Sequence, residues 1–336
     1  MFQRYKSFCF DVLRLQTSNI QSRCNSALSK VEAKERRKLL FDKEKEQQKA
    51  AIGRIQKIQV KYISAVEEVT LVMNKDISTP YECARHISEG VSKISALALV
   101  DGVPWDMHKP LMSDCELKLL NLQSPQENAV NTAFWRTCSF LLGAIVDSAF
   151  KPDVKVHLHS FPAPIIKSGS FVYDVYVEIP DWKPTDIEMR AMSAQFVKLS
   201  NQELPIERIE TTEDVALDMF QENPFKYQQI PDIAKNNNDK ITLYRVGDHV
   251  DISKGPMIGN TYLMGRCTIA AVHKLTTADM ENMYRFQGVA LPKGILLNHF
   301  AYSILENRAK KLNDAAWVPQ SIVDNINGPL QMSANN

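Results

Sequence analysis

Two short segments carry polar side chains of the kinds that could activate a water molecule or hold a charged ligand. The first spans residues 134–140 (Phe-Trp-Arg-Thr-Cys-Ser-Phe) and the second spans residues 250–257 (Val-Asp-Ile-Ser-Lys-Gly-Pro-Met). Hydrolysis at neutral pH calls for an imidazole or a thiolate, because these groups titrate in that range. Arg136 stays cationic and cannot act as a base, and Ser253 has no adjacent base to activate it. A lone carboxylate at Asp251 does not complete such a site, so no catalytic residues are expected.

The same two segments resemble the editing domain of the threonyl-tRNA synthetases. In that family the first segment reads Trp-His-x-x-x-His and the second reads Asp-x-Cys-Arg-Gly-Pro-His. The two family histidines match Arg136 and Phe140, and the family cysteine and last histidine match Ser253 and Met257. All four of these polar side chains are replaced, while Trp135, Asp251, Gly255 and Pro256 of the surrounding motifs are kept. The resemblance therefore implies an editing fold that has lost the side chains with which the family hydrolyses serine wrongly attached to threonine tRNA.

Other groups of residues with possible chemistry predict no metal or cofactor site. His157 and His159 are two apart on a predicted strand, and two ligands without a third do not close a metal site. Met280, Met283 and Tyr284 have helical spacing and are expected in the core. No phosphate-binding glycine loop and no Cys-x-x-Cys pair occurs in the chain, so neither a nucleotide cofactor nor a zinc knuckle is expected.

Length and composition favour a two-domain globular protein with extensions. The 336 residues are 44% hydrophobic and 24% charged, and no uninterrupted apolar run approaches the roughly 18 residues of a membrane span. Residues 1–30 carry five cations against Asp11 alone and form an amphipathic, acid-poor pattern typical of a mitochondrial transit peptide. Because the whole chain has a net charge of only +1, the rest is slightly acidic. RNA contacts should then be local, with much of the binding surface facing protein.

A charged helical extension is predicted over residues 31–54. Its composition favours helix, but its apolar residues are sparse. Two interpretations stay open: a solvated helix with charge pairs along its surface, or an extension that becomes ordered against RNA or a protein partner. The candidate RNA contacts are Lys34, Arg36, Arg37 and Lys38 in this extension and Lys254 in the second segment.

Residues 55–124 predict a small mixed domain. Apolar residues alternate over 58–62 and 69–73 as in strands, Thr79 precedes Pro80 as a helix cap, and Asp101-Gly102 closes a further strand. The segment 100–106 and the residues around 109–120 resemble the β-grasp (ubiquitin-like, TGS) domain at the start of threonyl-tRNA synthetases. Trp105 within it is expected to be a packing residue.

Residues 125–300 predict a larger α+β domain that corresponds to the editing domain without its ligands. Helical spacing covers 131–150, 186–199 and 213–220, and strand patterns cover 154–159, 171–177, 241–246 and 263–275. A charged helix is predicted over 296–312 and is followed by a short tail; residues 301–336 are assigned as the C-terminal helix and tail. The fold class is therefore α+β, with a β-grasp domain, an editing-like domain and helical extensions at both ends. The synthetase resemblance stops near residue 300, so the catalytic core of that family is expected to be absent.

The combination of these parts resembles a family of mitochondrial large-subunit ribosomal proteins that derive from a threonyl-tRNA synthetase-like ancestor. The resemblance implies a non-catalytic structural role in the mitochondrial matrix, with large-subunit ribosomal proteins and ribosomal RNA as partners and no small-molecule substrate. Two alternatives stay open. One is a free-standing hydrolase that clears misacylated tRNA in trans. The other is a tRNA-binding regulatory protein, which only Arg136 favours.

Overall fold

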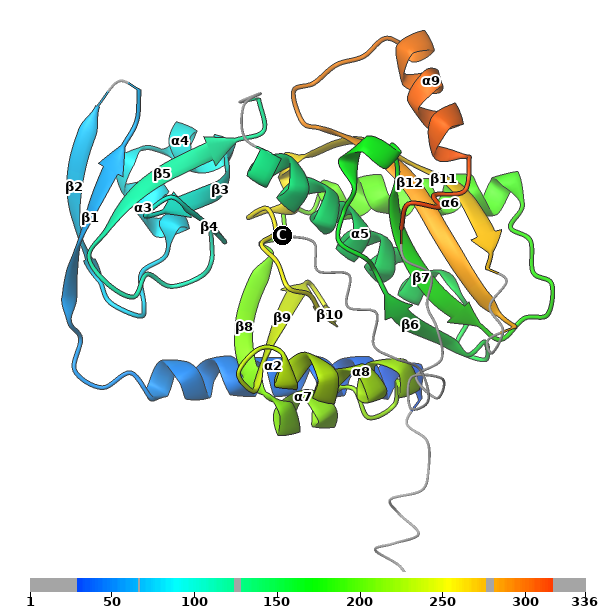
Figure 1. The fold of residues 1–336 in the computed structure, drawn as a ribbon, viewed down its shortest axis with the longest axis horizontal. Coiled ribbons are helices and arrows are strands. Elements are labelled where there is room, and N and C mark those ends of the chain that lie inside the picture. Colours follow the sequence, from blue (N-terminus) through cyan, green and yellow to red (C-terminus); the bar gives the residue numbers. More distant parts are fainter. Residues whose placement is uncertain (1–28, 66, 124–127, 276–280, 317–336) are drawn as a thin grey trace, which may run out of the picture.

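The structure is a computed structural model that describes residues 29–65, 67–123, 128–275 and 281–316. It contains a small domain and a larger one, with a long helix along one side of the molecule (Figure 1). Helices and strands are both abundant, which confirms the predicted α+β class. The predicted transit peptide lies outside the described residues except for its last two. The domain limits at residues 30, 54, 124 and 300 stay predictions.

The long helix, α2 (Lys30–Ala50), is held by its cap and by a narrow buried stripe. The Ser29 hydroxyl accepts a hydrogen bond from the Glu32 N–H, and the Glu32 carboxylate accepts one from the Ser29 N–H, which forms a capping box. Phe41 is fully buried in a cluster with residues of the larger domain, and Ala33 and Arg37 are buried beside it. The extension therefore packs against its own chain through an aromatic side chain, an arrangement that neither of the two open interpretations described.

The small domain is a β-grasp fold. Its five-stranded sheet has the order β2-β1-β5-β3-β4, with β1 and β5 parallel at its centre and the other pairs antiparallel. Thr79 caps the first helix of this domain and Pro80 begins it, as predicted. Its elements are β1 (Lys57–Ile63), β2 (Glu68–Asn74), α3 (Pro80–Ile87), α4 (Glu89–Ile94), β3 (Ser95–Val100), β4 (Val103–Trp105) and β5 (Cys115–Asn121).

The larger domain is built on two antiparallel sheets. One has the order β11-β12-β7-β6 and the other has the order β10-β9-β8. The strands are β6 (Val156–Ser160), β7 (Phe171–Val177), β8 (Glu207–Thr212), β9 (Lys240–Val246), β10 (His249–Ile252), β11 (Met264–Lys274) and β12 (Met283–Pro292). The helices are α5 (Asn128–Ala149), α6 (Asp186–Ser200), α7 (Glu213–Met219), α8 (Pro224–Lys235) and α9 (His299–Ala309), with short 3₁₀ helices at Ile166–Ser168 and Thr261–Leu263.

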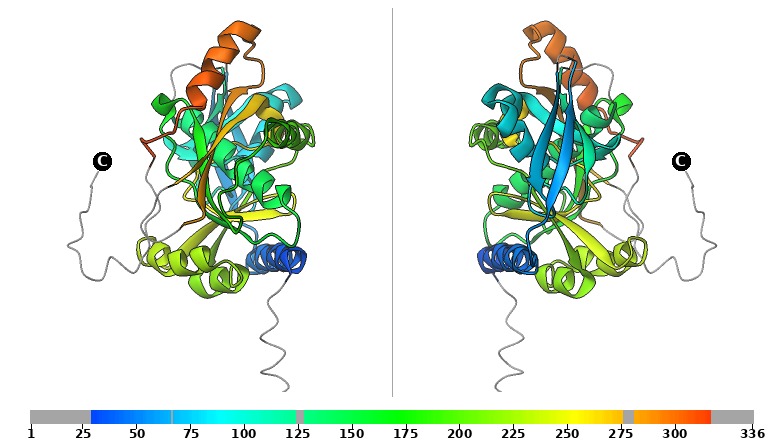
Figure 2. Two further views of the ribbon diagram at one scale, coloured as in Figure 1. Left: turned by 90° about the vertical axis from the view of Figure 1, so that its right-hand side faces the viewer. Right: turned by 90° about the vertical axis from the view of Figure 1, so that its left-hand side faces the viewer.

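The four-stranded sheet has helices on both faces. Side chains alternate along β12, so Tyr284 and Phe286 join the core under α5 and α6, whereas Val289 packs against α9 on the opposite face. Figure 2 shows α9 standing out beyond the body of the domain. Helix α5 has the length and composition of a membrane span, but 67% of its apolar window is buried inside the protein, which is expected of a central core helix.

Several local predictions were wrong. Met283 and Tyr284 begin strand β12 and do not form a helix, although both are buried as expected; Met280 lies outside the described residues. Helix α8 and strands β8 and β10 were not predicted. Helix α8 contains Pro231, which normally argues against a helix interior.

Candidate functional site

The structure brings the two sequence segments together. Arg136 and Phe140 lie on α5, and the second segment starts in β10 and continues into the loop that follows it. The Arg136 Nη1 donates a hydrogen bond to the Pro256 carbonyl oxygen at 3.2 Å. The Phe140 ring packs against the rings of Tyr244 and His249, with centroid distances of 6.4 and 5.1 Å. Through these positions α5 contacts both the loop after β10 and the strands β9 and β10.

Side chains fill this contact. Phe140 is 0% exposed, and Met257 and Asp251 are each 1% exposed. Ser253 is buried as well, and its hydroxyl accepts a hydrogen bond from the Gly255 N–H at 3.3 Å, which serves the turn. Gly255 has φ of +69°, and a Cβ there would lie 1.9 Å from the Tyr244 hydroxyl oxygen, so the turn requires glycine. These side chains are therefore packed in the interior of the protein.

The negative charge of Asp251 is compensated inside the protein by a neighbouring cation. Its Oδ1 lies 2.7 Å from the Lys226 Nζ, and the Tyr173 hydroxyl donates a hydrogen bond to its Oδ2. Burial is the largest influence and would raise the pKa of Asp251, but the charge of Lys226 and the hydrogen bonds from Lys226 and Tyr173 act together with the other nearby groups to lower it. Burial and the Asp251 charge raise the pKa of Tyr173 far above its usual value. The carboxylate is therefore an ion-pair partner and not a base available to a water molecule.

His249 is an imidazole next to this pair that sequence reasoning missed. It is 4% exposed, and neither ring nitrogen has a hydrogen-bond partner among the described residues. Burial lowers the pKa of His249 to about 4, so the ring is neutral at physiological pH. A base with such a low pKa is poorly matched to proton abstraction near neutrality. His249 acts here as a packing residue against Phe140.

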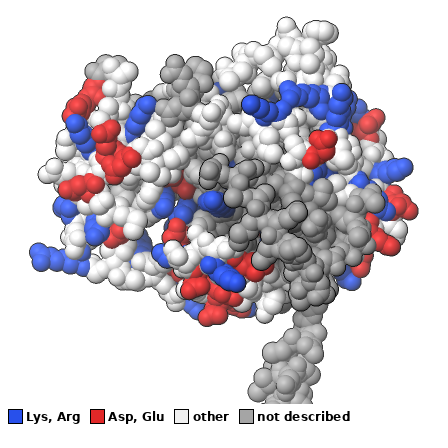
Figure 3. Space-filling model, in the orientation of Figure 1, with Lys and Arg blue, Asp and Glu red and all other residues white. Residues whose placement is uncertain are grey.

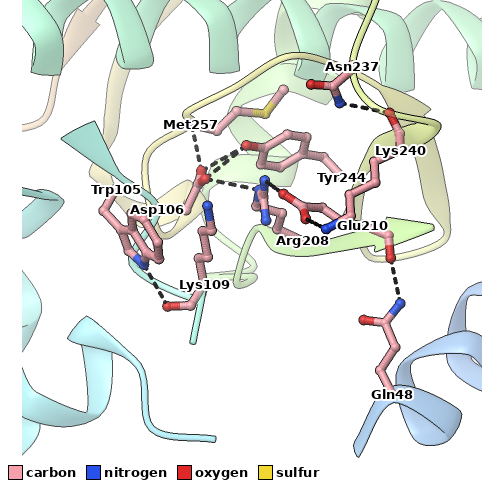
Figure 4. Close-up of polar contacts among 10 residues, drawn as sticks. All are labelled: Gln48, Trp105, Asp106, Lys109, Arg208, Glu210, Asn237, Lys240, Tyr244 and Met257. Atoms are coloured by element: carbon pink, nitrogen blue, oxygen red, sulfur yellow. Dashed lines mark hydrogen bonds and ion pairs between the residues drawn. The ribbon is translucent and has the colours of Figure 1, made fainter. Parts of the chain in front are cut away.

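The second segment also joins the two domains. Asp106 follows β4 of the small domain, and its carboxylate accepts a hydrogen bond from the Met257 N–H at 2.8 Å. The Tyr244 hydroxyl lies 3.0 Å from both carboxylate oxygens, and the Arg208 Nε lies 3.3 Å from Oδ2 (Figure 4). A second link runs from the His108 Nε2 to the Gly259 carbonyl oxygen at 2.9 Å. Segment 250–257 has therefore become part of a domain joint.

Neighbouring side chains continue the joint toward α2. Arg208 pairs with Glu210 at 2.6 Å, and the Gln48 side chain of α2 donates to the Glu210 carbonyl oxygen at 2.5 Å (Figure 4). In the small domain the Trp105 indole donates to the Lys109 carbonyl oxygen, and the Lys109 Nζ lies 3.7 Å from its ring centroid. Trp105 thus packs and supports the loop, as predicted.

The candidate RNA contacts on α2 differ in their surroundings. Arg36, Arg37 and Lys38 are paired with Asp218, Glu222 and Asp248, respectively, all within the chain. Lys34 and Lys254 make no ion pair with a described residue, and both are at least partly exposed. The three paired cations therefore serve the packing of the helix first.

The histidines of β6 do not form a ligand pair. His159 is buried and its ring packs against Phe225 at 5.0 Å, while His157 stacks near Tyr176. Across the described ranges, no three His, Cys, Asp or Glu side chains lie close enough together to hold a metal ion.

Comparison with known proteins agrees with this geometry. A TGS domain matches residues 69–121. The large ribosomal subunit protein mL39 of Drosophila melanogaster is 52% identical over 278 residues, which cover 82% of this chain and 84% of that protein. The chain belongs to the mL39 family. This mL39-family chain is also 28% identical over 229 residues to human cytoplasmic threonine–tRNA ligase 1, and 30% identical over 220 residues to Arabidopsis thaliana mitochondrial threonine–tRNA ligase 1.

The ligase matches are partial. They cover 66% and 64% of the mL39-family chain but only 29% of each ligase. The resemblance to both families that the sequence motifs indicated is thus confirmed: one relationship spans most of the chain, and a more distant one links it to the threonyl-tRNA synthetases.

Proposed function

We propose that this protein is a non-catalytic structural component of the large subunit of the mitochondrial ribosome, located in the mitochondrial matrix. The observation that carries the proposal is the 52% identity to a large ribosomal subunit protein over most of both chains. Residues 1–30, with their transit-peptide pattern, are consistent with import into mitochondria. Its partners would be large-subunit ribosomal proteins and ribosomal RNA, and it would bind no small-molecule substrate or cofactor.

The former editing site supports a structural role. Its water-activating positions hold Arg136, Phe140, Ser253 and Met257, and the remaining Asp251 is paired with Lys226. The Met257 backbone instead holds the carboxylate of Asp106 in the small domain. A site converted into a domain joint fixes the two domains relative to each other, which suits a protein that presents a preformed surface to its neighbours.

Local RNA contacts are assigned to the two candidate cations that make no ion pair with a described residue. Lys34 on α2 and Lys254 in the loop after β10 are proposed to contact phosphates. For Arg36, Arg37 and Lys38, a phosphate would have to compete with the carboxylates already in place. Substituting Lys34 or Lys254 should weaken RNA contact more than substituting any of the three paired cations.

Gradient sedimentation of detergent-lysed mitochondria tests the structural role. The protein should comigrate with the large ribosomal subunit in magnesium, and it should stay with that subunit when low magnesium separates the subunits. A peak confined to the free-protein fractions would contradict the proposal.

A deacylation assay separates this role from a trans-editing hydrolase. Purified protein should not release serine from seryl-tRNA above the rate of a buffer control. Turnover that Asp251→Ala abolishes would instead establish the enzyme. Saturable tRNA binding with a steep dependence on salt would favour the regulatory alternative. The structure gives this alternative little support, because Arg136, the residue that favoured it, donates a hydrogen bond to the Pro256 carbonyl oxygen of the same chain.

A further inference from the structure

Exposed apolar side chains are concentrated around one helix. Of the 17 large hydrophobic side chains that are exposed among the described residues, six lie between residues 295 and 312. Leu296 is 92% exposed and Phe300 is 75% exposed. The others are Ile295, Leu297, Ile304 and Leu312. Single exposed apolar residues are ordinary, but a group of them within one short segment, on α9 and directly beside it, points to an interaction surface.

Helix α9 does not need these residues to stay in place. Its inward face holds Tyr302, which is fully buried in a cluster with Val289 and Ala309. The Gln287 side chain donates to the Ala309 carbonyl oxygen at 2.9 Å and so holds the C-terminal end of the helix to the sheet. Phe300 and Ile304 are one turn apart on the outward face. The helix thus presents an apolar outer face from a rigidly held position.

The end of the same helix is basic. Arg308, Lys310, Lys311 and the neighbouring Lys167 are exposed, and none of them makes an ion pair with a described residue. The Arg308 Nη2 donates to the Lys167 carbonyl oxygen, which holds the two segments together. Figure 3 shows a white protrusion at the top with a row of Lys and Arg side chains beneath it. This arrangement differs from α2, where Arg36, Arg37 and Lys38 each face a carboxylate of the same chain.

We propose that the outward face of α9, together with residues 295–297, is the docking surface for another protein of the large ribosomal subunit. The contacting segment of that partner would place apolar side chains against Leu296, Phe300 and Ile304 and carboxylates beside the basic end. This inference rests on the proposed function and names the surface that serves it. The C-terminal dipole of α9 explains a cation at Arg308 but not the apolar group next to it.

The composition of the surface favours protein over RNA. An RNA-binding surface neutralises phosphates with cations across its centre. Here the cations are at one end, and the centre consists of aliphatic and aromatic side chains, which is the anatomy of a protein–protein interface with an apolar core and a polar rim. A buried aromatic anchor such as Phe300 commonly carries a large part of the binding free energy in such interfaces.

The first test replaces the apolar anchors in the full-length protein. Leu296→Glu/Phe300→Glu should reduce the amount of protein that sediments with the large subunit by at least about tenfold relative to wild type. Ile187→Glu is the matched control, because Ile187 is 72% exposed on a different helix, α6, and should sediment like wild type. Circular dichroism and thermal unfolding of the purified variants should match wild type, since every changed side chain is exposed.

Cross-linking identifies what covers the surface. A carbodiimide joins a lysine ammonium directly to a carboxylate as an amide, with loss of water. In wild-type subunits, links from Lys310 or Lys311 to an acidic residue of another ribosomal protein are expected. Ultraviolet cross-links from residues 295–311 to RNA without such protein links would overturn the inference. Links only to residues 317–336 of the same chain, or only to a second copy, would overturn it too.

The two proposals fail in different ways. If wild type and the Leu296/Phe300 variant sediment equally with the large subunit, the docking surface is wrong and the ribosomal role stands. If wild type itself never sediments with the subunit, the ribosomal role is wrong, and the docking inference falls with it.

Discussion

The Lys226 ammonium lies 2.7 Å from the Asp251 carboxylate, and the two side chains are 3% and 1% exposed. Lys226 comes from α8 and Asp251 from β10, so the pair joins two elements of the larger domain. Ionised groups are rarely buried unless they are paired. The Asp251 carboxylate, paired in this way, is part of the structural core.

Breaking this pair should be costly. Lys226→Met leaves Asp251 as an uncompensated buried charge, and we expect it to lower the free energy of unfolding by about 3–5 kcal/mol. Lys226→Met/Asp251→Asn should recover most of that loss, because no net charge then remains in the core. Urea unfolding measures both.

An exposed pair provides the control. Lys155 and Glu178 form an ion pair at 3.3 Å with side chains 68% and 47% exposed, so Lys155→Met should cost less than about 1 kcal/mol. Equal losses for the two Lys→Met variants would mean that the buried pair does not contribute as argued.

Acid should destabilise the protein in part through His249. Its folded-state pKa is about 4, below the ordinary value of 6.5, so the unfolded chain binds the proton more tightly. Stability is therefore fully present above pH 6.5 and falls as the pH drops toward 4, by roughly 3 kcal/mol from this residue alone. Asp251 acts in the same direction, because its pKa is lower in the folded state than in the unfolded chain. Its contribution to stability is full at pH values above the unfolded-state pKa and is lost as the pH falls through the folded-state pKa.

His249→Phe should flatten this dependence. The aromatic replacement keeps the packing against Phe140, so unfolding at pH 7 should change little while the loss between pH 6.5 and 4 becomes smaller. Burial also lowers the pKa of His159 to about 4, so the free energy of unfolding of His249→Phe should still fall somewhat with pH because of His159. Substituting the exposed His299 by Gln is the control, and an unchanged pH profile in His249→Phe would refute the assignment.

Local patterns in the sequence predicted much of the fold. The strand predicted over 171–177 has the same bounds as β7, and the cap at Thr79 begins α3 as expected. Such features depend on neighbours within a few residues. Strand β12 did not follow its local pattern, because pairing with β7 and β11 overrides the helical spacing of Met283 and Tyr284.

The site itself was only half predictable. The positions Arg136, Phe140, Ser253 and Met257 were found through the resemblance to the synthetase motifs, and the structure joins the two segments through Arg136 and the Pro256 carbonyl. Lys226 could not be paired with Asp251 from sequence, because 25 positions separate them and α8 was not predicted; their relation exists only in the folded chain. The same is true of Asp106, which meets Met257 across 151 positions.

Helix α2 should detach when its aromatic anchor is removed. Phe41 is fully buried against the larger domain, and Phe41→Ala is expected to destabilise that contact by about 3–5 kcal/mol. The loss should be local, so hydrogen exchange in residues 30–50 should accelerate while the strands of the four-stranded sheet stay protected. Leu39→Ala is the control, because Leu39 is 68% exposed on the same helix. Uniformly faster exchange across both domains would show that α2 is integral to global unfolding.

The domain joint offers the last prediction. Asp106→Leu removes the acceptor for the Met257 N–H and the Tyr244 hydroxyl and takes away one of the two carboxylates that Arg208 faces, the other being that of Glu210. Because buried donors then lack acceptors, the joint should weaken by about 3 kcal/mol or more. The N–H groups of residues 257–259 should exchange faster, while the β-grasp core keeps its protection. Asp114→Leu, at an exposed carboxylate of the same domain, should leave residues 257–259 unaffected. If Asp106→Leu leaves exchange there unchanged, the two domains are held together by other contacts, such as that between His108 and Gly259.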